Sequence, residues 1–182
     1  MDDQRTDWFL TSTGRRVFVT EPRVADICVE DIAHSLSMIC RFGGHCQEFY
    51  SVAQHSVWVS DRLPPSLARH GLLHDATEAY LGDVVRPLKR QLAQYQALEA
   101  RWWQAICERF GLEDTDAALV KHVDLRALMT ERRDLTYRGR RAPYAWVEDE
   151  ASVSADPERI VPVGPETAKY LFLSRCQQLE VL

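Results

Sequence analysis

The segment HGLLHDATEAYLGD, at residues 70–83, places several ionisable side chains within an apolar helical pattern. His74 stands beside Asp75, and Glu78 and Asp83 follow in the same segment. On a helix, Glu78 lies on the same side as His74 and Asp75, because it is four and three residues away from them. An unpaired buried carboxylate is costly, so a group of them requires a cation. The segment therefore predicts a metal site.

Other segments must complete such a site. Neighbouring side chains on a helix diverge by about 100°, so an ion between His74 and Asp75 needs ligands from elsewhere. His55, in SVAQHSV, is flanked by valines that would turn it inward, and Asp124, in VKHVDLRALM, lies between apolar residues. Two imidazoles and two carboxylates suit Mn²⁺, Co²⁺, Fe²⁺ or Mg²⁺ with open positions for water, more than a closed structural zinc site.

Each of these two added residues also has a structural interpretation. A single inward histidine such as His55 is more often a hydrogen-bonded core residue than a ligand, and Asp124 alone could face solvent. Several carboxylates gathered in an apolar setting need a compensating charge, and this need favours the interpretation as a metal site. The four residues together therefore favour a metal site, although none of them does so alone.

The elements that must position these residues are mostly helical. WFLTSTGRRVFVTEP alternates around Thr13-Gly14, which predicts a β-hairpin. Apolar spacing then predicts helices over residues 29–42, 51–63, 66–82 and 87–110, another that starts at Asp114 or Thr115, and a last one from Pro165. Their expected N-caps include Ser51 and Ser66, and their expected ends are Gly43-Gly44, Gly82 and Gly111.

The length bounds the domain organisation. At 182 residues and 20.9 kDa, the chain is long enough for one domain with its own core and short for two. We expect one mostly α domain over residues 1–182. It would comprise a β-like preface at 1–25, a helical core at 26–136, and a C-terminal loop and helix at 137–182.

Composition excludes several classes of partner. The net charge of -5 and the pI near 5.7 give no general attraction to nucleic acid polymers. No apolar run approaches the ~20 residues that span a bilayer, and the N-terminal MDDQRTDWFL lacks a signal-like pattern, so we expect a cytoplasmic protein without a membrane partner. The five cysteines include no C-x-x-C pair, which favours reduced thiols over a disulfide framework or zinc ribbon.

The order of the four candidate ligands, H…HD…D, resembles that of the HD-domain superfamily of metal-dependent phosphohydrolases. HDATEAYLGDVVRPLK is similar to the branch that contains bacterial 5′-deoxynucleotidases and phage dNTP triphosphohydrolases, and the likeness runs from about Ile32 to about Leu128. Some deoxynucleotidases have a proline where this chain has Val85. The resemblance implies an HD-domain helical bundle, here with a short N-terminal β-hairpin.

The resemblance also implies a role for each matched residue. The metal ligands would be His55, His74, Asp75 and Asp124. Glu78 would orient or deprotonate the attacking water, and Asp83 would contact that water or the sugar and leaving oxygen. The family's arginine-aromatic pair matches Arg41 and Phe42 in CRFGGH, so Arg41 would grip phosphate and Phe42 would lie near the sugar or base. Lys89 would complete an anion clamp.

These roles imply hydrolysis of a small-molecule nucleotide. Metal-bound water would attack the α-phosphorus of a nucleoside 5′-phosphate, and the family likeness favours 2′-deoxynucleotides. A monophosphate would release phosphate, and a triphosphate would release triphosphate. Two alternatives stay open: a nucleotide-binding regulatory module with little turnover, and a helical protein that uses its metal for stability. We also expect a homo-oligomer, with Trp102-Trp103 in the core or at the subunit interface.

Overall fold

We describe a computed structural model of the chain over residues 5–112, 117–136 and 153–181. It is mostly helical with a two-stranded antiparallel hairpin, which confirms the predicted class. The elements are β1 (Trp8–Leu10), β2 (Arg16–Phe18), η2 (Val24–Asp26), α1 (Val29–Met38), η3 (Arg41–Gly44), α2 (Val52–Asp61), α3 (Pro65–Leu73), α4 (Glu78–Leu81), α5 (Arg86–Lys89), α6 (Ala93–Phe110), α7 (Ala117–Leu135) and α8 (Pro165–Gln178). No helix within these ranges is both long enough and apolar enough to cross a bilayer.

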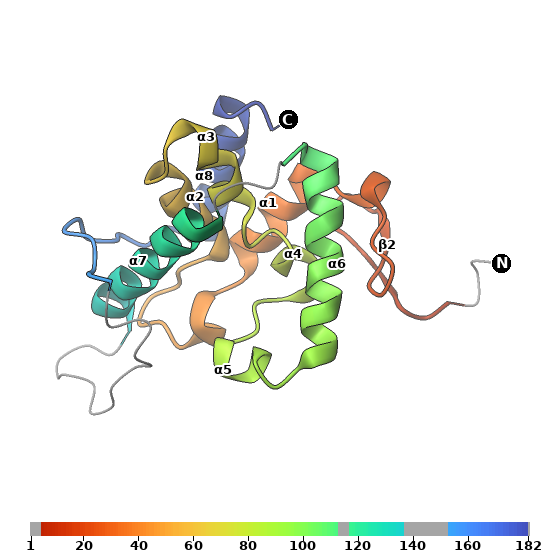
Figure 1. The fold of residues 1–182 in the computed structure, drawn as a ribbon, viewed down its shortest axis with the longest axis horizontal. Coiled ribbons are helices and arrows are strands. Elements are labelled where there is room, and N and C mark those ends of the chain that lie inside the picture. Colours follow the sequence, from red (N-terminus) through yellow and green to blue (C-terminus); the bar gives the residue numbers. More distant parts are fainter. Residues whose placement is uncertain (1–4, 113–116, 137–152, 182) are drawn as a thin grey trace.

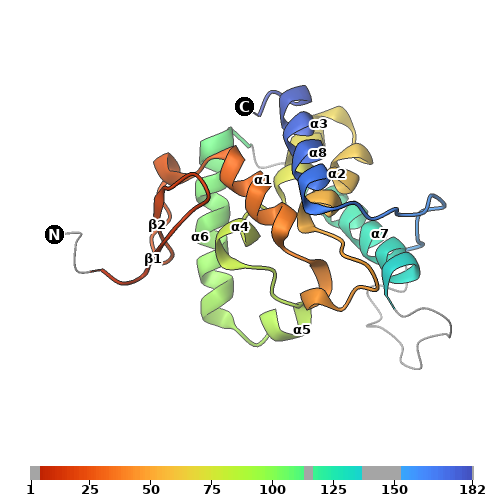
Figure 2. The same cartoon turned by 180° about the vertical axis from the view of Figure 1, so that it is seen from behind.

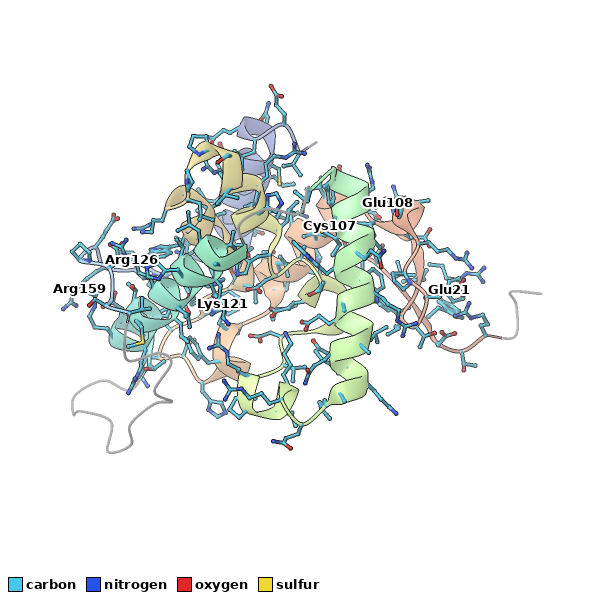
Figure 3. The ribbon with its side chains drawn as sticks, viewed as in Figure 1. Glu21, Cys107, Glu108, Lys121, Arg126 and Arg159 are labelled. Atoms are coloured by element: carbon cyan, nitrogen blue, oxygen red, sulfur yellow. The ribbon has the colours of Figure 1, made fainter. Side chains whose placement is uncertain are left out.

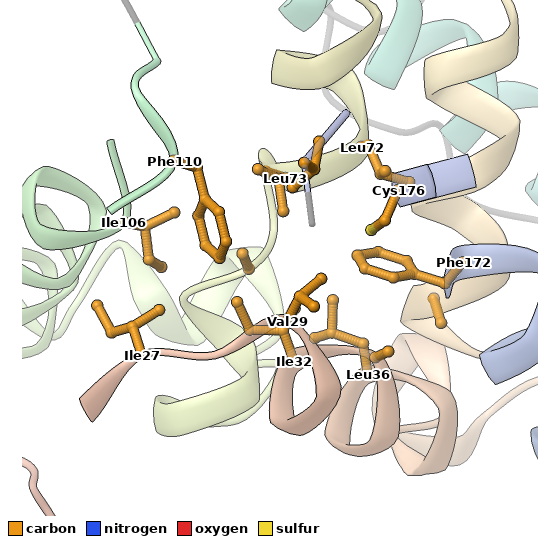
Figure 4. Close-up of a cluster of buried hydrophobic side chains, with 14 of the residues drawn as sticks. Ile27, Val29, Ile32, Leu36, Leu72, Leu73, Ile106, Phe110, Phe172 and Cys176 are labelled. Carbon is orange, nitrogen blue, oxygen red and sulfur yellow. The ribbon is translucent and has the colours of Figure 1, made fainter. Parts of the chain in front are cut away.

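Helix α1 lies at the centre of the fold, between α2, α3, α7 and α8 on one side and α6 with the hairpin on the other (Figures 1 and 2). Its apolar face buries Ile32 and Leu36 completely. Figure 4 shows these side chains among residues from α3, α6 and α8, including Phe172 of α8. Burial of each large aliphatic side chain stabilises the fold by about 1.5–3 kcal/mol. This packing holds the surrounding helices against α1.

The N-terminal hairpin forms at the predicted turn. Phe9 pairs with Val17, and Gly14 takes a φ of 80°, a left-handed conformation that glycine adopts without strain. The turn is fixed to α1 through Asp31, which is buried. Its carboxylate accepts hydrogen bonds from Ser12 Oγ at 2.7 Å, from Thr13 N at 2.8 Å and from Thr13 Oγ1 at 2.7 Å.

The first predicted helix is shorter than expected. It was expected to run to Gly43-Gly44, but α1 ends at Met38. The backbone after it is extended because Cys40 forms an antiparallel bridge with Ser51, and Arg41 N donates to Tyr50 O at 2.9 Å. Residues 41–44 then form the tight turn η3.

The helix that holds the opening motif is also interrupted. It was expected to start after a Ser66 cap and run to Gly82, but α3 begins at Pro65, with Pro64 as its N-cap, and ends at Leu73. Residues 74–77 wind more tightly, through bonds such as Glu78 N to Asp75 O at 3.0 Å, before the short α4. His74 and Asp75 therefore occupy a turn rather than a regular helix, and Glu78 begins α4.

The long helix predicted from Pro87 divides into α5 and α6. At the break, Lys89 O accepts from Leu92 N at 3.1 Å and from the Gln96 side chain at 2.7 Å. These bonds replace the i→i+4 bond that a continuous helix would make there. Tyr95 OH also donates to Gly82 O at 2.9 Å, which connects the start of α6 to the end of α4.

Other predicted boundaries are confirmed. Ser51 caps α2 by accepting from Gln54 N, Gly111 ends α6 in a left-handed conformation, and Pro165 is the first residue of α8. The predicted start near Asp114 or Thr115 lies outside the described residues, and α7 is described from Ala117.

The five cysteines are free thiols, as predicted. Trp102 is fully buried, stacks on Tyr80 with ring centroids 4.2 Å apart, and donates its indole N–H to Val19 O at 2.9 Å. It is therefore a core residue that also holds the hairpin against α6.

Residues 153–163 follow α7 back along its surface, where Figure 3 labels Arg126 on the helix and Arg159 on the returning segment. Asp156 fixes this segment. Its carboxylate lies 2.8 Å from Arg126 Nη2 and 3.2 Å from Arg62 Nε, and its backbone N–H donates to Thr130 Oγ1 at 2.8 Å. The segment is thereby held between α2 and α7.

The contact between Asp31 and the hairpin predicts a pH-dependent loss of stability in Asp31→Asn. Burial alone raises the pKa of Asp31, but hydrogen bonds from Ser12, Cys28 and Thr13 outweigh it and lower the pKa from 3.8 to about 2. At pH 7 we expect the variant to lose about 1.5–3 kcal/mol of unfolding free energy, the range for hydrogen bonds to a charged group.

The stabilisation by ionised Asp31 is present above its unfolded pKa and is lost as the pH falls through its native pKa. The difference between variant and wild type should therefore shrink between about pH 4 and about pH 2. Urea unfolding along this pH series measures it. A difference that stays constant from pH 7 to below pH 3 would contradict the assignment.

Candidate metal centre

Three packed elements bring the predicted ligands together. His55 lies on α2, His74 and Asp75 lie in the turn that follows α3, and Asp124 lies on α7. Helix α2 packs against both α3 and α7, and the three helices lie side by side in Figures 1 and 2. Residues distant in sequence therefore meet at one place in the fold.

Their donor atoms converge. His55 Nε2 lies 3.3 Å from His74 Nε2, 3.2 Å from Asp124 Oδ1 and 3.5 Å from Asp75 Oδ2. His74 Nε2 lies 3.2 Å from Asp75 Oδ2 and 3.8 Å from Asp124 Oδ1. An ion bound at about 2.1 Å from each donor requires donor–donor separations of roughly 3.0–3.5 Å. These five separations lie within a few tenths of an ångström of that range, and His55, His74 and Asp124 together form a group that could hold an ion.

Hydrogen bonds fix both imidazoles in the orientation that a metal ligand needs. His55 Nδ1 lies 2.6 Å from Glu131 Oε1, and His74 Nδ1 lies 2.7 Å from Gly71 O. Because both partners are acceptors, each Nδ1 holds a proton, so that each ring in its neutral form has its lone pair on Nε2. Both Nε2 atoms face the centre of the cluster.

The electrostatic potential of the cluster favours a positive charge. Burial alone lowers the pKa of His74, but the carboxylates of Asp75 and Asp124 raise it well above its ordinary value. Burial raises the pKa of Asp124, yet its hydrogen bonds with His55 and His74 hold that pKa well below its ordinary value. The carboxylates thus stay ionised and attract a cation to the imidazole nitrogens.

Glu78 lies beside the cluster and is 7% exposed. Its Oε2 is buried and has no hydrogen-bond partner among the described residues. Burial, then the charges of Asp75 and Asp83, raise the pKa of Glu78 well above its ordinary value. A buried carboxylate oxygen without a partner is unfavourable, so it points to a missing water or cation at this position. The donor set and this oxygen both fit a divalent ion with bound water.

Asp83 follows α4, where the chain turns at Gly82. Gly82 takes a φ of 79°, which favours glycine, and its carbonyl accepts the Tyr95 hydroxyl. Burial raises the pKa of Asp83, with the charge of Arg41 opposing and that of Asp75 adding to the effect. These electrostatic interactions connect Asp83 with the same cluster.

Arg41 and Lys89, the two residues predicted to bind phosphate, differ in their surroundings. Arg41 Nη1 lies 3.6 Å from Asp75 Oδ2, while its Nε and Nη2 each lie 3.0 Å from Glu131 Oε2. Lys89 pairs with Glu99 of α6. The structure therefore brings Arg41 into direct contact with the cluster, whereas the Lys89 ammonium contacts Glu99 on α6.

Phe42 follows Arg41 with a φ of 57°, in the left-handed region that non-glycine residues rarely adopt. The Arg41 guanidinium lies 5.6 Å from the centroid of its ring. A strained residue of this kind persists only when its surroundings hold it, and such residues gather at functional sites.

Two residues of the site were not predicted from the sequence. Glu131 is fully buried between Arg41 and His55, and Arg86 Nη2 lies 3.8 Å from Asp124 Oδ2 with its side chain 43% exposed. Glu131 had a detectable signal, because it stands seven residues after Asp124 and therefore two turns along the same face of α7. Arg86 had none, because surface arginines are common.

Comparison with known proteins places the chain among relatives of similar length. No model of a known protein family matches it. YfdR of Escherichia coli (strain K12) is 40% identical over 172 residues, which are 94% of this chain and 95% of YfdR. The chain belongs to the YfdR family. A protein of Rhodobacter capsulatus is 36% identical over 124 residues, 63% of each chain. Both relatives are named uncharacterized proteins, so neither name supplies an activity.

The geometry predicts that His74→Ala abolishes binding of a divalent ion to this YfdR-family chain. Removing an inner ligand should cost more than the roughly 10- to 100-fold lost on mutation of outer partners. Titration calorimetry with Mn²⁺ measures the dissociation constant, and circular dichroism checks the fold.

His122→Ala is the matched control, because His122 is exposed on α7. It should bind Mn²⁺ as the wild type does. Wild-type affinity in His74→Ala would exclude His74 as a ligand.

Proposed function

We propose that this protein is a metal-dependent phosphohydrolase that cleaves nucleoside 5′-phosphates, with 2′-deoxynucleotides as the expected substrates. The observation that supports it most is the convergence of two imidazoles and two carboxylates beside Glu78 Oε2, an oxygen with no partner among the described residues. The H…HD…D order, which resembles the HD-domain superfamily, is the second support.

The proposed ligands are His55, His74, Asp75 and Asp124. When bound there, a divalent ion supplies a lower pKa for a water ligand, from 15.7 to about 7, and offsets charge on phosphoryl oxygens. The side chains of Asp75 and Asp124 are each about one-fifth exposed, so solvent reaches the cluster beside them. Substrate phosphate would approach from that side.

In this proposal, the residues around the cluster handle the proton and the phosphate. Water attacks the α-phosphorus while Glu78 accepts its proton, the bond from phosphorus to the 5′ oxygen breaks, and the departing 5′ oxygen takes up that proton. Positive charge bound in the cluster lowers the raised pKa of Glu78 and so favours the carboxylate form that a base requires. Asp83 would orient the water or the sugar.

Two arginines near the cluster are proposed to meet the phosphate. Arg41 reaches the cluster through Asp75, and the exposed Arg86 reaches it through Asp124. Charge-assisted hydrogen bonds from arginine stabilise phosphoryl oxygens better than neutral donors do. We propose that these two residues, with Lys89 at the edge, contact the substrate, and that Phe42 lies near its sugar or base.

A substrate panel tests the proposal directly. We expect Mn²⁺, Co²⁺ or Mg²⁺ to support hydrolysis of at least one deoxynucleoside mono-, di- or triphosphate, with ribonucleotides cleaved more slowly. Chromatography resolves the products. Nucleotide binding without any product would favour a regulatory module instead. Loss of the circular dichroism spectrum on addition of EDTA would favour a structural metal, because the catalytic proposal expects turnover to stop while the fold persists.

Glu78→Gln tests the proton acceptor. The substitution keeps the size of the side chain but removes the base, so turnover should fall by about 10²-fold or more, the usual scale of general-base catalysis. Binding of Mn²⁺ and nucleotide should persist. Calorimetry measures this binding, and a single-turnover assay measures the turnover.

Glu108→Gln is the control for this change, because Glu108 is exposed on α6, far along the chain from the cluster residues. This control should leave both the turnover and the binding of Mn²⁺ and nucleotide unchanged. Lost Mn²⁺ binding in Glu78→Gln would make Glu78 a ligand, and unchanged turnover would remove it from the reaction.

A further inference from the structure

Glu131 is a fully buried carboxylate to which the proposed reaction gives no role. Burial raises its pKa, but the charges of Arg41 and His55 lower it more, so that the pKa lies below its ordinary value. A buried charge of this kind persists only when it is fully paired, and removing one partner is strongly destabilising. The charge of Glu131 balances that of Arg41, but the same carboxylate also contacts His55.

The two oxygens of Glu131 bind different functional residues. Oε1 lies 2.6 Å from Nδ1 of His55, and Oε2 lies 3.0 Å from both Nε and Nη2 of Arg41. One carboxylate on α7 therefore joins a residue of α2 with a residue of the turn η3. Both partners are side chains that the proposed function uses.

The bond to His55 determines which of its nitrogens can bind a metal. A carboxylate only accepts hydrogen bonds, so Nδ1 must hold the proton, and Nε2 then presents its lone pair. That Nε2 lies 3.2 Å from Asp124 Oδ1 and 3.3 Å from His74 Nε2. Without the bond, the ring could exchange its proton between nitrogens and rotate.

The bond to Arg41 orients the guanidinium in a similar way. Because Nε and Nη2 share one oxygen, the plane of the guanidinium is fixed, and Nη1 is the nitrogen left on the side of Asp75, at 3.6 Å from Oδ2. The Arg41 side chain is 12% exposed, so it has little freedom to reorient. Glu131 thereby places one guanidinium nitrogen at the edge of the cluster.

We propose that Glu131 is a positioning residue that sets the ligand His55 and the phosphate-binding Arg41 as one unit, so that metal affinity and substrate affinity depend on the same carboxylate. This inference rests on the proposed function. It goes beyond that function by making a residue outside the metal and substrate contacts responsible for both. A purely structural Glu131 would affect stability without affecting either affinity specifically.

Glu131→Gln is a sharp test because an amide cannot replace both hydrogen bonds. If its oxygen accepts from His55, its NH₂ group faces the Arg41 guanidinium, and two donors oppose each other. If its oxygen faces Arg41, its NH₂ group faces His55 Nδ1 and favours the proton on Nε2. In the first orientation the nucleotide contact through Arg41 should weaken, and in the second the Mn²⁺ dissociation constant should rise roughly 10- to 100-fold, the usual effect of losing an outer partner of a metal ligand. The KM for the best nucleotide of the panel should rise in the same variant.

Thr130→Val is the matched control. Thr130 is also fully buried on α7, next to Glu131, but its hydroxyl bonds to Arg126 O and Asp156 N rather than to the cluster. The substitution leaves Asp156 N without its acceptor, so it should lower thermal stability. The Mn²⁺ dissociation constant and KM should stay within about threefold of the wild type, because neither bond of Thr130 reaches the cluster. A tenfold change would correspond to about 1.4 kcal/mol.

A second variant covers the case in which Glu131→Gln does not fold. Arg41→Met with Glu131→Met replaces the buried pair by apolar side chains of similar length, which is often neutral for stability. His55 again loses its acceptor, so weaker Mn²⁺ binding is expected there too. Nitrogen NMR of the imidazoles, at a pH where they are neutral, should show that His55 no longer holds its proton on Nδ1 alone.

The outcomes separate this inference from the proposed function. Wild-type values of both the Mn²⁺ dissociation constant and KM in Glu131→Gln, or equal weakening in Thr130→Val, would overturn the positioning role while leaving the metal site intact. An unchanged His55 tautomer in the double variant would also overturn it. If the wild type itself binds no Mn²⁺, the proposed function fails and this inference fails with it.

Discussion

The need to keep several carboxylates charged in a mostly buried place is the constraint on which this structure depends. Asp75, Asp124 and Glu131 surround two imidazoles and one guanidinium, and Glu78 lies beside them. Buried charges are tolerated only when their partners are held in good geometry. Helices α2, α3 and α7 must therefore pack in one register, and the core around α1 provides the apolar contact that holds them there.

Much of the fold could be predicted because local chemistry decides it. Ser51, Gly111 and Pro165 mark helix boundaries through interactions within one turn, and Gly14 marks the hairpin. The wrong boundaries depend on distant partners. The helix of residues 29–42 ends early because Cys40 pairs with Ser51, and the helix from Pro87 breaks where Lys89 O finds a side-chain donor. Neither contact is visible in a local pattern.

The site shows the same division. His55, His74 and Asp124 could be predicted from residue type and apolar flanks, and the structure brings their donor atoms together as a group that could hold an ion. Asp75, also predicted as a ligand, lies beside them, 3.2 Å from His74 Nε2. The environment of Arg41 could not be predicted, because nothing in the sequence around Arg41 indicates that its partner is Glu131 on α7. Sequence identifies chemical groups well, but the hydrogen-bond partners that orient them depend on tertiary packing.

The position of the ligands on separate helices has a consequence for the stability of the whole chain. His55 belongs to α2 and Asp124 to α7, so an ion held by both would act as a crosslink between two helices that also meet through side-chain packing and the hydrogen bond of His55 with Glu131. A species that binds only the native state adds RT ln(1 + [L]/Kd) to its stability, which is about 1.4 kcal/mol for each tenfold rise in free ion above Kd. The supply of metal would thus govern how often α7 separates from α2, and so how long the chain survives proteases that cleave open forms.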